Sequence, residues 1–249
     1  MKNDDQPRRK FLRQVIAILP ASSLAPALLS QTACTDSNGA ADTPSNGATA
    51  NRESSGEAYK PTFFTAAEWD FVHAASDELI PADETGAGAI EAGVPEFIDR
   101  QMETPYGHGK LWYMHGPFHP EAAPELGYQS GLVPRDIYRH GIDACDAWCE
   151  RQYGRPFAAL PHETRVQVLE TLEAGKVHFD AVPAKLFFNT LLKNTKEGYW
   201  ADPMYGGNKN MAGWKMIGFP GARADFADWV EQPGVKYPLG PVSILGEQA

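Results

Sequence analysis

The chain has 249 residues, of which 43% are hydrophobic and 22% are charged, and its formal net charge is −10. This length predicts one domain of ordinary size, once an N-terminal leader and a low-complexity segment are set aside. The acidic balance argues against nucleic-acid binding, because phosphate recognition needs clustered Lys and Arg.

The N-terminal segment 1–34 resembles a twin-arginine export signal. Arg8 and Arg9 precede a weakly apolar run that Pro20 and Pro26 interrupt. The run is shorter than the roughly 20 continuous apolar residues that a membrane-spanning helix needs. An ordinary secretory signal and a short membrane anchor are the alternatives. Since the twin-arginine pathway carries folded proteins, this leader predicts a periplasmic chain that acquires a cofactor, or a cofactor-bearing partner, before export.

Cys34 ends the apolar leader and is followed by a tract of Ser, Gly, Ala and Asn. This layout resembles a lipoprotein leader, in which the cysteine becomes the lipidated first residue. However, Gln31 stands where such leaders usually carry Leu. Lipidation at Cys34 and simple cleavage nearby therefore both stay open. Acyl chains at this position would attach the protein to a membrane without a spanning helix.

An all-α domain of about six helices is predicted for residues 61–249, after a disordered linker at 35–60. The linker almost lacks apolar side chains large enough to build a core. Capping signals and apolar spacings of three and four predict helices near 65–80, 95–102, 134–153, 161–174, 183–198 and 223–230. No convincing alternation of apolar and polar residues indicates a strand.

The same spacings predict which side chains face the core. They are Trp69, Val72, Ser76 and Leu79 in the first helix, Ile137, Gly141, Ala144 and Trp148 in the third, Val168, Leu169 and Leu172 in the fourth, and Leu186, Phe187, Thr190 and Leu191 in the fifth.

Two long connections, 104–133 and 199–221, are rich in Gly, Pro, aromatic residues and Met. Structureless connections of this length are uncommon inside a compact domain and are usually functional. Their large apolar side chains either fold back onto the helices or are covered by another subunit. The side chains concerned are Trp112, Tyr113, Met114, Phe118, Tyr128, Trp200, Met204, Tyr205, Trp214, Met216 and Phe219.

The sequence offers little catalytic apparatus. It lacks a Gly-x-Gly-x-x-Gly motif after a strand, a Walker loop, a Gly-x-Ser-x-Gly elbow and a Cys-x-x-Cys-His haem motif. His108, His115 and His119, with Glu121 beyond them, could hold a transition metal, but their spacing matches no known site. Surface or hydrogen-bonded histidines are the other interpretation. We therefore assign no catalytic, cofactor-binding or metal-ligating residue from the sequence.

Cys145 and Cys149 are four residues apart on a predicted helix, so they share one face. Three interpretations stay open: two buried small hydrophobic residues, a local or inter-subunit disulfide in an oxidising periplasm, and a metal site. The metal site lacks a second Cys or His pair at comparable spacing.

Several blocks of the chain resemble the gluconate 2-dehydrogenase subunit 3 family. They are Phe63–Trp69, Leu79–Gly86, Ala92–Asp99 and, more specifically, Asn194–Asn208 and Gly213–Arg223. The likeness extends from Phe63 to about Leu239, and the twin-arginine leader also fits.

The resemblance implies a small, or gamma, accessory subunit of a membrane-associated dehydrogenase complex. In that family, a large flavoprotein of the glucose-methanol-choline type holds FAD and oxidises a sugar or sugar acid. A multihaem cytochrome c subunit often passes the electrons to quinone. The small subunit carries the export signal for the flavoprotein and stabilises it.

The chain itself is then expected to be non-catalytic, to hold no cofactor and to reach the periplasmic side of the inner membrane. The substrate of the complex would be a property of the flavoprotein. The alternative is a free-standing periplasmic redox or metal-binding protein that uses the loop with His108, His115 and His119.

Overall fold

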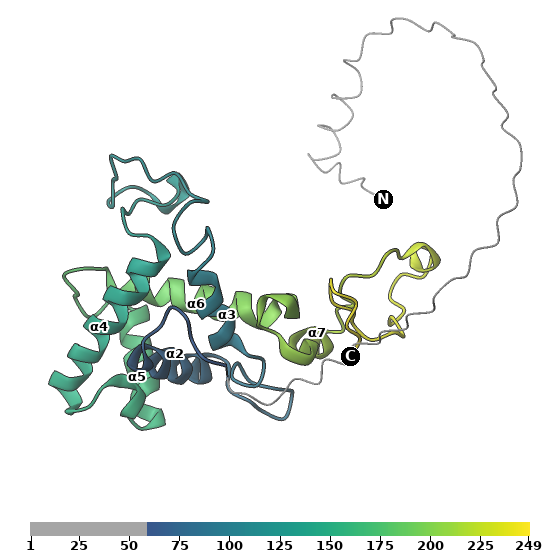
Figure 1. Ribbon diagram of the computed structural model, residues 1–249, viewed down its shortest axis with the longest axis horizontal. Coiled ribbons are helices and arrows are strands. Elements are labelled where there is room, and N and C mark those ends of the chain that lie inside the picture. The colour runs from purple at the N-terminus through teal and green to yellow at the C-terminus, as the bar shows by residue number, and fades with distance from the viewer. Residues whose placement is uncertain (1–58) are drawn as a thin grey trace, which may run out of the picture. The chain divides into compact units, whose positions relative to one another are not determined.

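The computed structural model describes residues 59–249 of the chain. The described residues do not include the predicted leader at 1–34, nor nearly all of the predicted linker at 35–60. The structure therefore does not test whether Cys34 is lipidated. Residues 59–249 contain six α-helices and no strand (Figure 1). The helices are α2 (Ala66–Leu79), α3 (Val94–Met102), α4 (Pro134–Tyr153), α5 (His162–Glu173), α6 (Ala184–Trp200) and α7 (Ala212–Ile217). The all-α prediction is confirmed.

Helices α2 to α6 begin and end within two residues of their predicted bounds. The first turn of α2 shows why its start could be predicted. The Glu68 amide donates to Thr65 Oγ1, and the Thr65 amide donates to Glu68 Oε2, so the predicted capping box is formed. At α4, Pro134 occupies the first turn and Gly154 ends the helix in the left-handed conformation.

The helix predicted at 223–230 is wrong, because only a short 3-10 turn at Ala227–Trp229 forms there. Phe226 and Trp229 pack on the ring of Tyr237 instead of on the helical body. An eight-residue helix has too few internal hydrogen bonds to persist without an apolar face packed against a neighbour. Conversely, the six-residue helix α7 lies inside the connection 199–221 that the sequence described as irregular.

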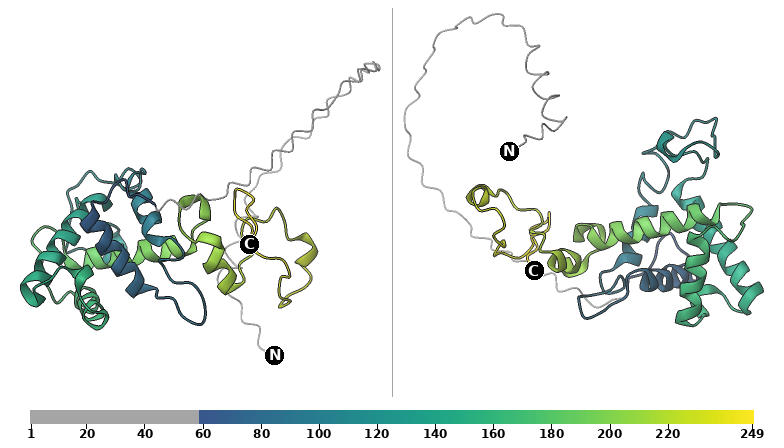
Figure 2. Two further views of the ribbon diagram at one scale, coloured as in Figure 1. Left: turned by 60° about the horizontal axis from the view of Figure 1, so that its bottom comes forward. Right: turned by 180° about the vertical axis from the view of Figure 1, so that it is seen from behind.

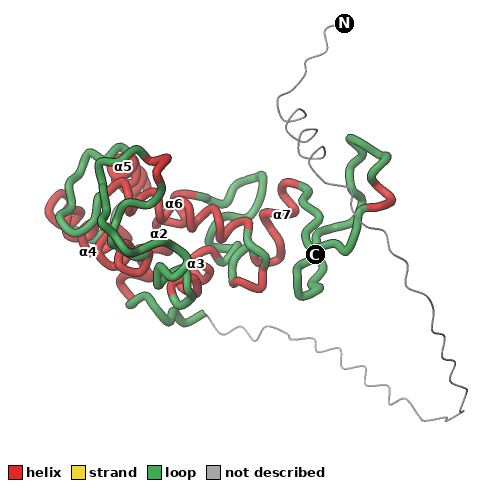
Figure 3. Tube along the Cα trace, turned by 90° about the horizontal axis from the view of Figure 1, so that it is seen from above, coloured by secondary structure: helices red, strands yellow, loops and turns green. Residues whose placement is uncertain are grey.

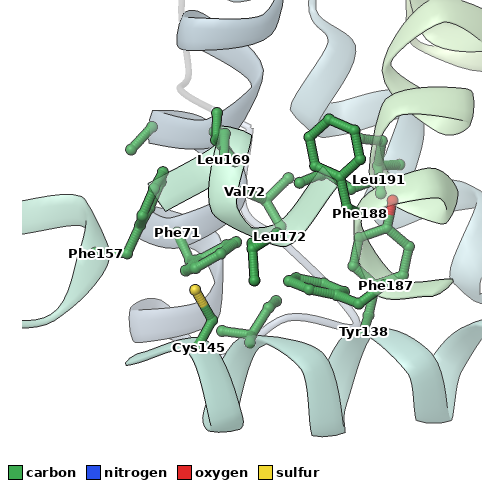
Figure 4. Packing of buried hydrophobic residues seen from close by; sticks show 14 of the residues in the cluster. Phe71, Val72, Tyr138, Cys145, Phe157, Leu169, Leu172, Phe187, Phe188 and Leu191 are labelled. Atoms are coloured by element: carbon green, nitrogen blue, oxygen red, sulfur yellow. The ribbon is translucent and has the colours of Figure 1, made fainter. Parts of the chain in front are cut away.

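Helix α6 is the central element of the helical body. It contacts α3, α4 and α5, while α2 packs against α3 and α5 (Figures 2 and 3). Figure 4 shows side chains from four helices meeting in one cluster, among them Phe71, Tyr138, Leu172 and Phe187. All four are fully buried, and the ring centroids of Phe71 and Phe187 are 5.8 Å apart. None of the helices within residues 59–249 is both long enough and apolar enough to cross a bilayer.

The buried faces of two helices are rotated relative to the predicted stripes. In α4, Ile137 and Gly141 are buried as predicted, but Cys145 and Cys149 are buried where Ala144 and Trp148 were expected. In α2, Val72 and Ser76 are buried, whereas Trp69 and Leu79 are only partly buried; Phe71 and Ala75 complete that face. The predictions for Val168, Leu169 and Leu172 in α5 are confirmed. In α6, Phe187 and Leu191 are buried, while Leu186 and Thr190 lie at the edge.

Replacing Gly141 by Ala is expected to destabilise the fold, because the ring of Phe187 of α6 lies directly against this residue of α4. A Cβ atom at position 141 would lie 2.2 Å from a ring carbon of Phe187. Ala is favoured over Gly inside a helix by about 1 kcal/mol, whereas overpacking a core typically costs about 1–3 kcal/mol or more. We therefore expect a net loss of stability in urea unfolding.

Gly86→Ala is the matched control for Gly141→Ala, since a Cβ there would meet nothing closer than the sulfur of Met216 at 3.8 Å. Equal unfolding midpoints for the two variants would contradict the packing of α4 on α6.

Candidate functional site

The histidines of the connection 104–133 lie beside different partners. His108 Nε2 is 3.4 Å from a guanidinium nitrogen of Arg135, and His119 Nδ1 is 3.2 Å from Glu121 Oε1. The side chain of His115 is exposed. In the part of the chain that the structure describes, no three His, Cys, Asp or Glu side chains are grouped so that they could hold a metal ion. The structure thus does not bring the three imidazoles together.

Cys145 and Cys149 are both buried and both carry free thiols. A hydrogen bond to Cys149, together with burial, raises the pKa of the Cys145 thiol well above its usual value. A protonated, buried thiol is a poor nucleophile and a poor metal ligand. The geometry fits the interpretation of two small hydrophobic residues in the core.

The aromatic side chains of the connection 104–133 divide into two groups. Trp112 stacks on Tyr128 with ring centroids 4.7 Å apart, and both are partly buried. Tyr106 packs edge-on against Trp112 and accepts a hydrogen bond from Asn194 of α6 at 2.8 Å. These rings therefore fold back onto the helical body. Near the tip of the connection, the side chain of Tyr113 stays 77% exposed.

The second connection forms a sharp corner between α6 and α7 that depends on Asn208. This buried side chain donates from Nδ2 to the Ala201 carbonyl at 2.9 Å and accepts the Gly213 amide at Oδ1 at 2.8 Å. Asn208 and Met211 both have positive φ, a strained conformation for residues other than Gly. The bonds of Asn208 thus hold the end of α6 next to the beginning of α7.

Ion pairs fasten this corner to α3. Lys209 Nζ lies 2.5 Å from Glu96 Oε2, and Arg100 pairs with the other oxygen of the same carboxylate. The Lys209 amide donates to the Ala92 carbonyl at 3.0 Å. Gly93 has φ of 74°, and a Cβ there would lie 2.7 Å from the Gly206 carbonyl oxygen, so only glycine fits this close approach. The corner is therefore a rigid part of the helical body.

Several large apolar side chains are exposed at this corner and at the end of α7, and we call this group the α6–α7 face. Its members are Trp200, Met204, Tyr205, Met216, Ile217 and Phe219, which are 37–61% exposed. Trp214 was grouped with them from the sequence, but it is only 7% exposed and its indole N–H donates to the Trp200 carbonyl at 2.9 Å. Trp214 therefore belongs to the interior of the corner, which is the first of the two outcomes left open from the sequence.

The α6–α7 face offers a large contact area. Tyr and Trp bury a large rigid surface at low entropic cost, and Met adapts to irregular partners. Chain residues 241–244 pack beside the face, where Asp202 Oδ2 accepts the Ile244 amide at 2.7 Å. This arrangement can bind another protein surface.

The helical body also has two surface pockets that the sequence analysis did not predict. One, of about 640 Å³, is lined in part by Trp69, Asp70, His73 and Asp146. Burial raises the pKa of Asp146, whose Oδ1 also accepts the Phe157 amide at 2.8 Å. The carboxylate thus has a structural partner, which fixes the turn after α4. The other pocket, of about 770 Å³, lies between residues 118–132 and 181–189 and is mostly apolar.

One comparison with known proteins gives a match. A family model described as Gluconate 2-dehydrogenase subunit 3 matches residues 66–221. Neither the curated proteins nor the solved structures gave a match to the chain. The matched range contains all six described helices and the whole α6–α7 face, and it ends before the segment 222–249.

Proposed function

The chain belongs to the gluconate 2-dehydrogenase subunit 3 family, and we propose that it is the non-catalytic small subunit of a membrane-associated, FAD-dependent sugar or sugar-acid dehydrogenase complex. Its role would be to carry the flavoprotein through the twin-arginine pathway and to stabilise it in the periplasm. FAD would reside in a flavoprotein of the glucose-methanol-choline type, and haem c in a partner cytochrome.

The α6–α7 face is the observation that carries this proposal. Six large apolar side chains are exposed together on a corner that Asn208 and Glu96 hold rigid. A rigid, apolar surface suits a permanent partner better than a substrate, since obligate interfaces resemble a domain core cut in half. The leader supports the export role, because Arg8 and Arg9 belong to a chain with no cofactor motif of its own.

The direct test is co-purification from the native host. An affinity tag at the C-terminus of the full chain should retain a flavoprotein with bound FAD and no export signal of its own. Bound flavin or metal on the chain after it has been separated from every partner would contradict the non-catalytic role.

A triple replacement of His108, His115 and His119 by Gln is expected to leave turnover of the assembled complex nearly unchanged. The reason is that His108 lies beside Arg135 and His119 beside Glu121, while His115 is exposed, so the three imidazoles do not converge on one reacting atom. Turnover should be corrected for the amount of complex formed, using its flavin content.

General acid–base or metal chemistry at that loop would instead show a loss of about a hundredfold or more. Such a loss, with assembly and flavin content intact, would favour the alternative of a redox or metal-binding protein.

A further inference from the structure

Asp99 of α3 is a fully buried carboxylate that binds the first described residues of the chain. Its two oxygens accept five hydrogen bonds of 2.8–3.1 Å. The donors are Tyr59 Oη, the Thr62 amide and Oγ1, and the amides of Phe63 and Phe64. Burial and the Asp99 carboxylate raise the pKa of Tyr59 to about 12, which keeps its hydroxyl a donor. A carboxylate buried in this way is stabilised by these bonds, and the segment 59–64 is fixed in return.

Helix α4 holds the same segment from the other side. The guanidinium groups of Arg135 and Arg139 lie 4.5 and 4.2 Å from the ring centroid of Phe63. Arg139 also donates to the Phe63 carbonyl at 2.6 Å, and the rings of Phe63 and Phe64 are buried. The segment 59–64 is therefore held by α3 and α4 together, through partners that are 35 or more residues away in the sequence.

This segment is also the junction between the helical body and the N-terminal residues that carry Arg8 and Arg9. Its contacts require α3 and α4 to be folded and in place, because no local partner supplies them. When the contacts are absent, two phenylalanines and five backbone or side-chain donors are left without their partners at the C-terminal end of the linker.

We propose that Asp99 and the segment 59–64 form a latch that makes export depend on completed folding of α3 and α4. A closed latch buries Phe63 and Phe64. An open latch exposes an apolar, protease-sensitive segment at the C-terminal end of the linker that follows the leader. This inference rests on the proposed twin-arginine export of the chain, and it assigns to Asp99 a role that the family membership does not supply.

The in vitro test is limited proteolysis of the full-length chain with chymotrypsin, which cleaves after aromatic residues. Asp99→Asn keeps the side-chain size but turns one acceptor into a donor that faces the donors of the segment. Cleavage after Tyr59, Phe63 or Phe64 is expected to become at least tenfold faster. Asp83→Asn is the charge-matched control, because Asp83 is exposed and caps a local turn at Thr85. Unchanged protection in Asp99→Asn would overturn the latch.

The export test compares Asp99→Asn with a variant of the core that has the same thermal stability. Val168→Ala is suited as this control, because Val168 is buried in α5 and is remote from the latch in sequence. The exported fraction should fall several-fold for Asp99→Asn and much less for Val168→Ala. Equal losses would mean that export follows global stability, and the latch would be rejected.

If Asp99→Asn does not fold, Tyr59→Phe decides the question. It removes one of the five bonds and should give intermediate cleavage and export; wild-type values for both would reject the latch. The proposed function is tested separately by the double substitution Arg8→Lys and Arg9→Lys. This variant should block export, while segment 59–64 stays protected from chymotrypsin.

Discussion

Replacing Arg8 and Arg9 by Lys is expected to leave both this chain and its flavoprotein in the cytoplasm. The pair is the defining feature of the proposed twin-arginine leader, and the partner would travel only as cargo of this chain. The expected effect is close to complete loss from the periplasmic fraction. Cell fractionation followed by detection of both polypeptides measures it, and dehydrogenase activity at the membrane should disappear in parallel.

Arg13→Lys is the matched control, because it makes the same substitution in the same leader outside the pair. A flavoprotein that still reaches the periplasm without this chain would remove the escort role. Normal export of the chain itself would instead show that the leader uses the general secretory route. The two outcomes are distinguishable because both polypeptides are followed.

Five of the six helices could be predicted from sequence because their signals are local. The Thr65–Glu68 capping box, Pro134 and Gly154 act within one turn of the residues they terminate. Helix α7 could not be predicted in this way. It begins after left-handed Met211 and is held by the side chain of Asn208, so its first turn exists only once the corner has folded.

The rotation of the buried faces has a similar origin. Trp148 was placed inward because of its helical spacing from Ala144. It packs edge-on against Tyr153 near the end of α4, and the small thiols of Cys145 and Cys149 fill the core instead. Apolar spacing indicates that a stripe exists, but the neighbouring helices decide which of two adjacent stripes is buried.

The candidate site shows the same division between local and tertiary information. Composition alone left open whether the large apolar side chains of the connection 199–221 fold back onto the helices or are covered by another subunit, and the structure separates exposed Tyr205 from buried Trp214 within it. Asp99 carries no sequence signal, since an aspartate in a helix is usually a surface residue. Its role emerges only when residues 59–64 lie against α3.

The α6–α7 face should contain the main anchors for the flavoprotein. Replacing Tyr205, Met216 and Phe219 together by Ala is expected to weaken association by about a hundredfold or more. A central interface anchor is typically worth about 2 kcal/mol or more, and about 1.4 kcal/mol corresponds to a tenfold change in affinity. Because all three side chains are 43–46% exposed in this chain, helical content by circular dichroism should stay unchanged. Titration of the purified flavoprotein with each variant measures the affinity.

Two single variants make this experiment specific. Tyr153→Ala removes an aromatic side chain of similar exposure (42%) at the end of α4, and it should leave affinity unchanged. Trp214→Ala should lower the melting temperature, because it removes a buried indole and its hydrogen bond to the Trp200 carbonyl. If the triple variant instead loses helical content and Trp214→Ala does not, the exposed residues belong to the core and the interface lies elsewhere. If the triple variant keeps both its fold and wild-type affinity, the flavoprotein must dock on a different surface, and the tip of the connection 104–133 would be the next surface to test.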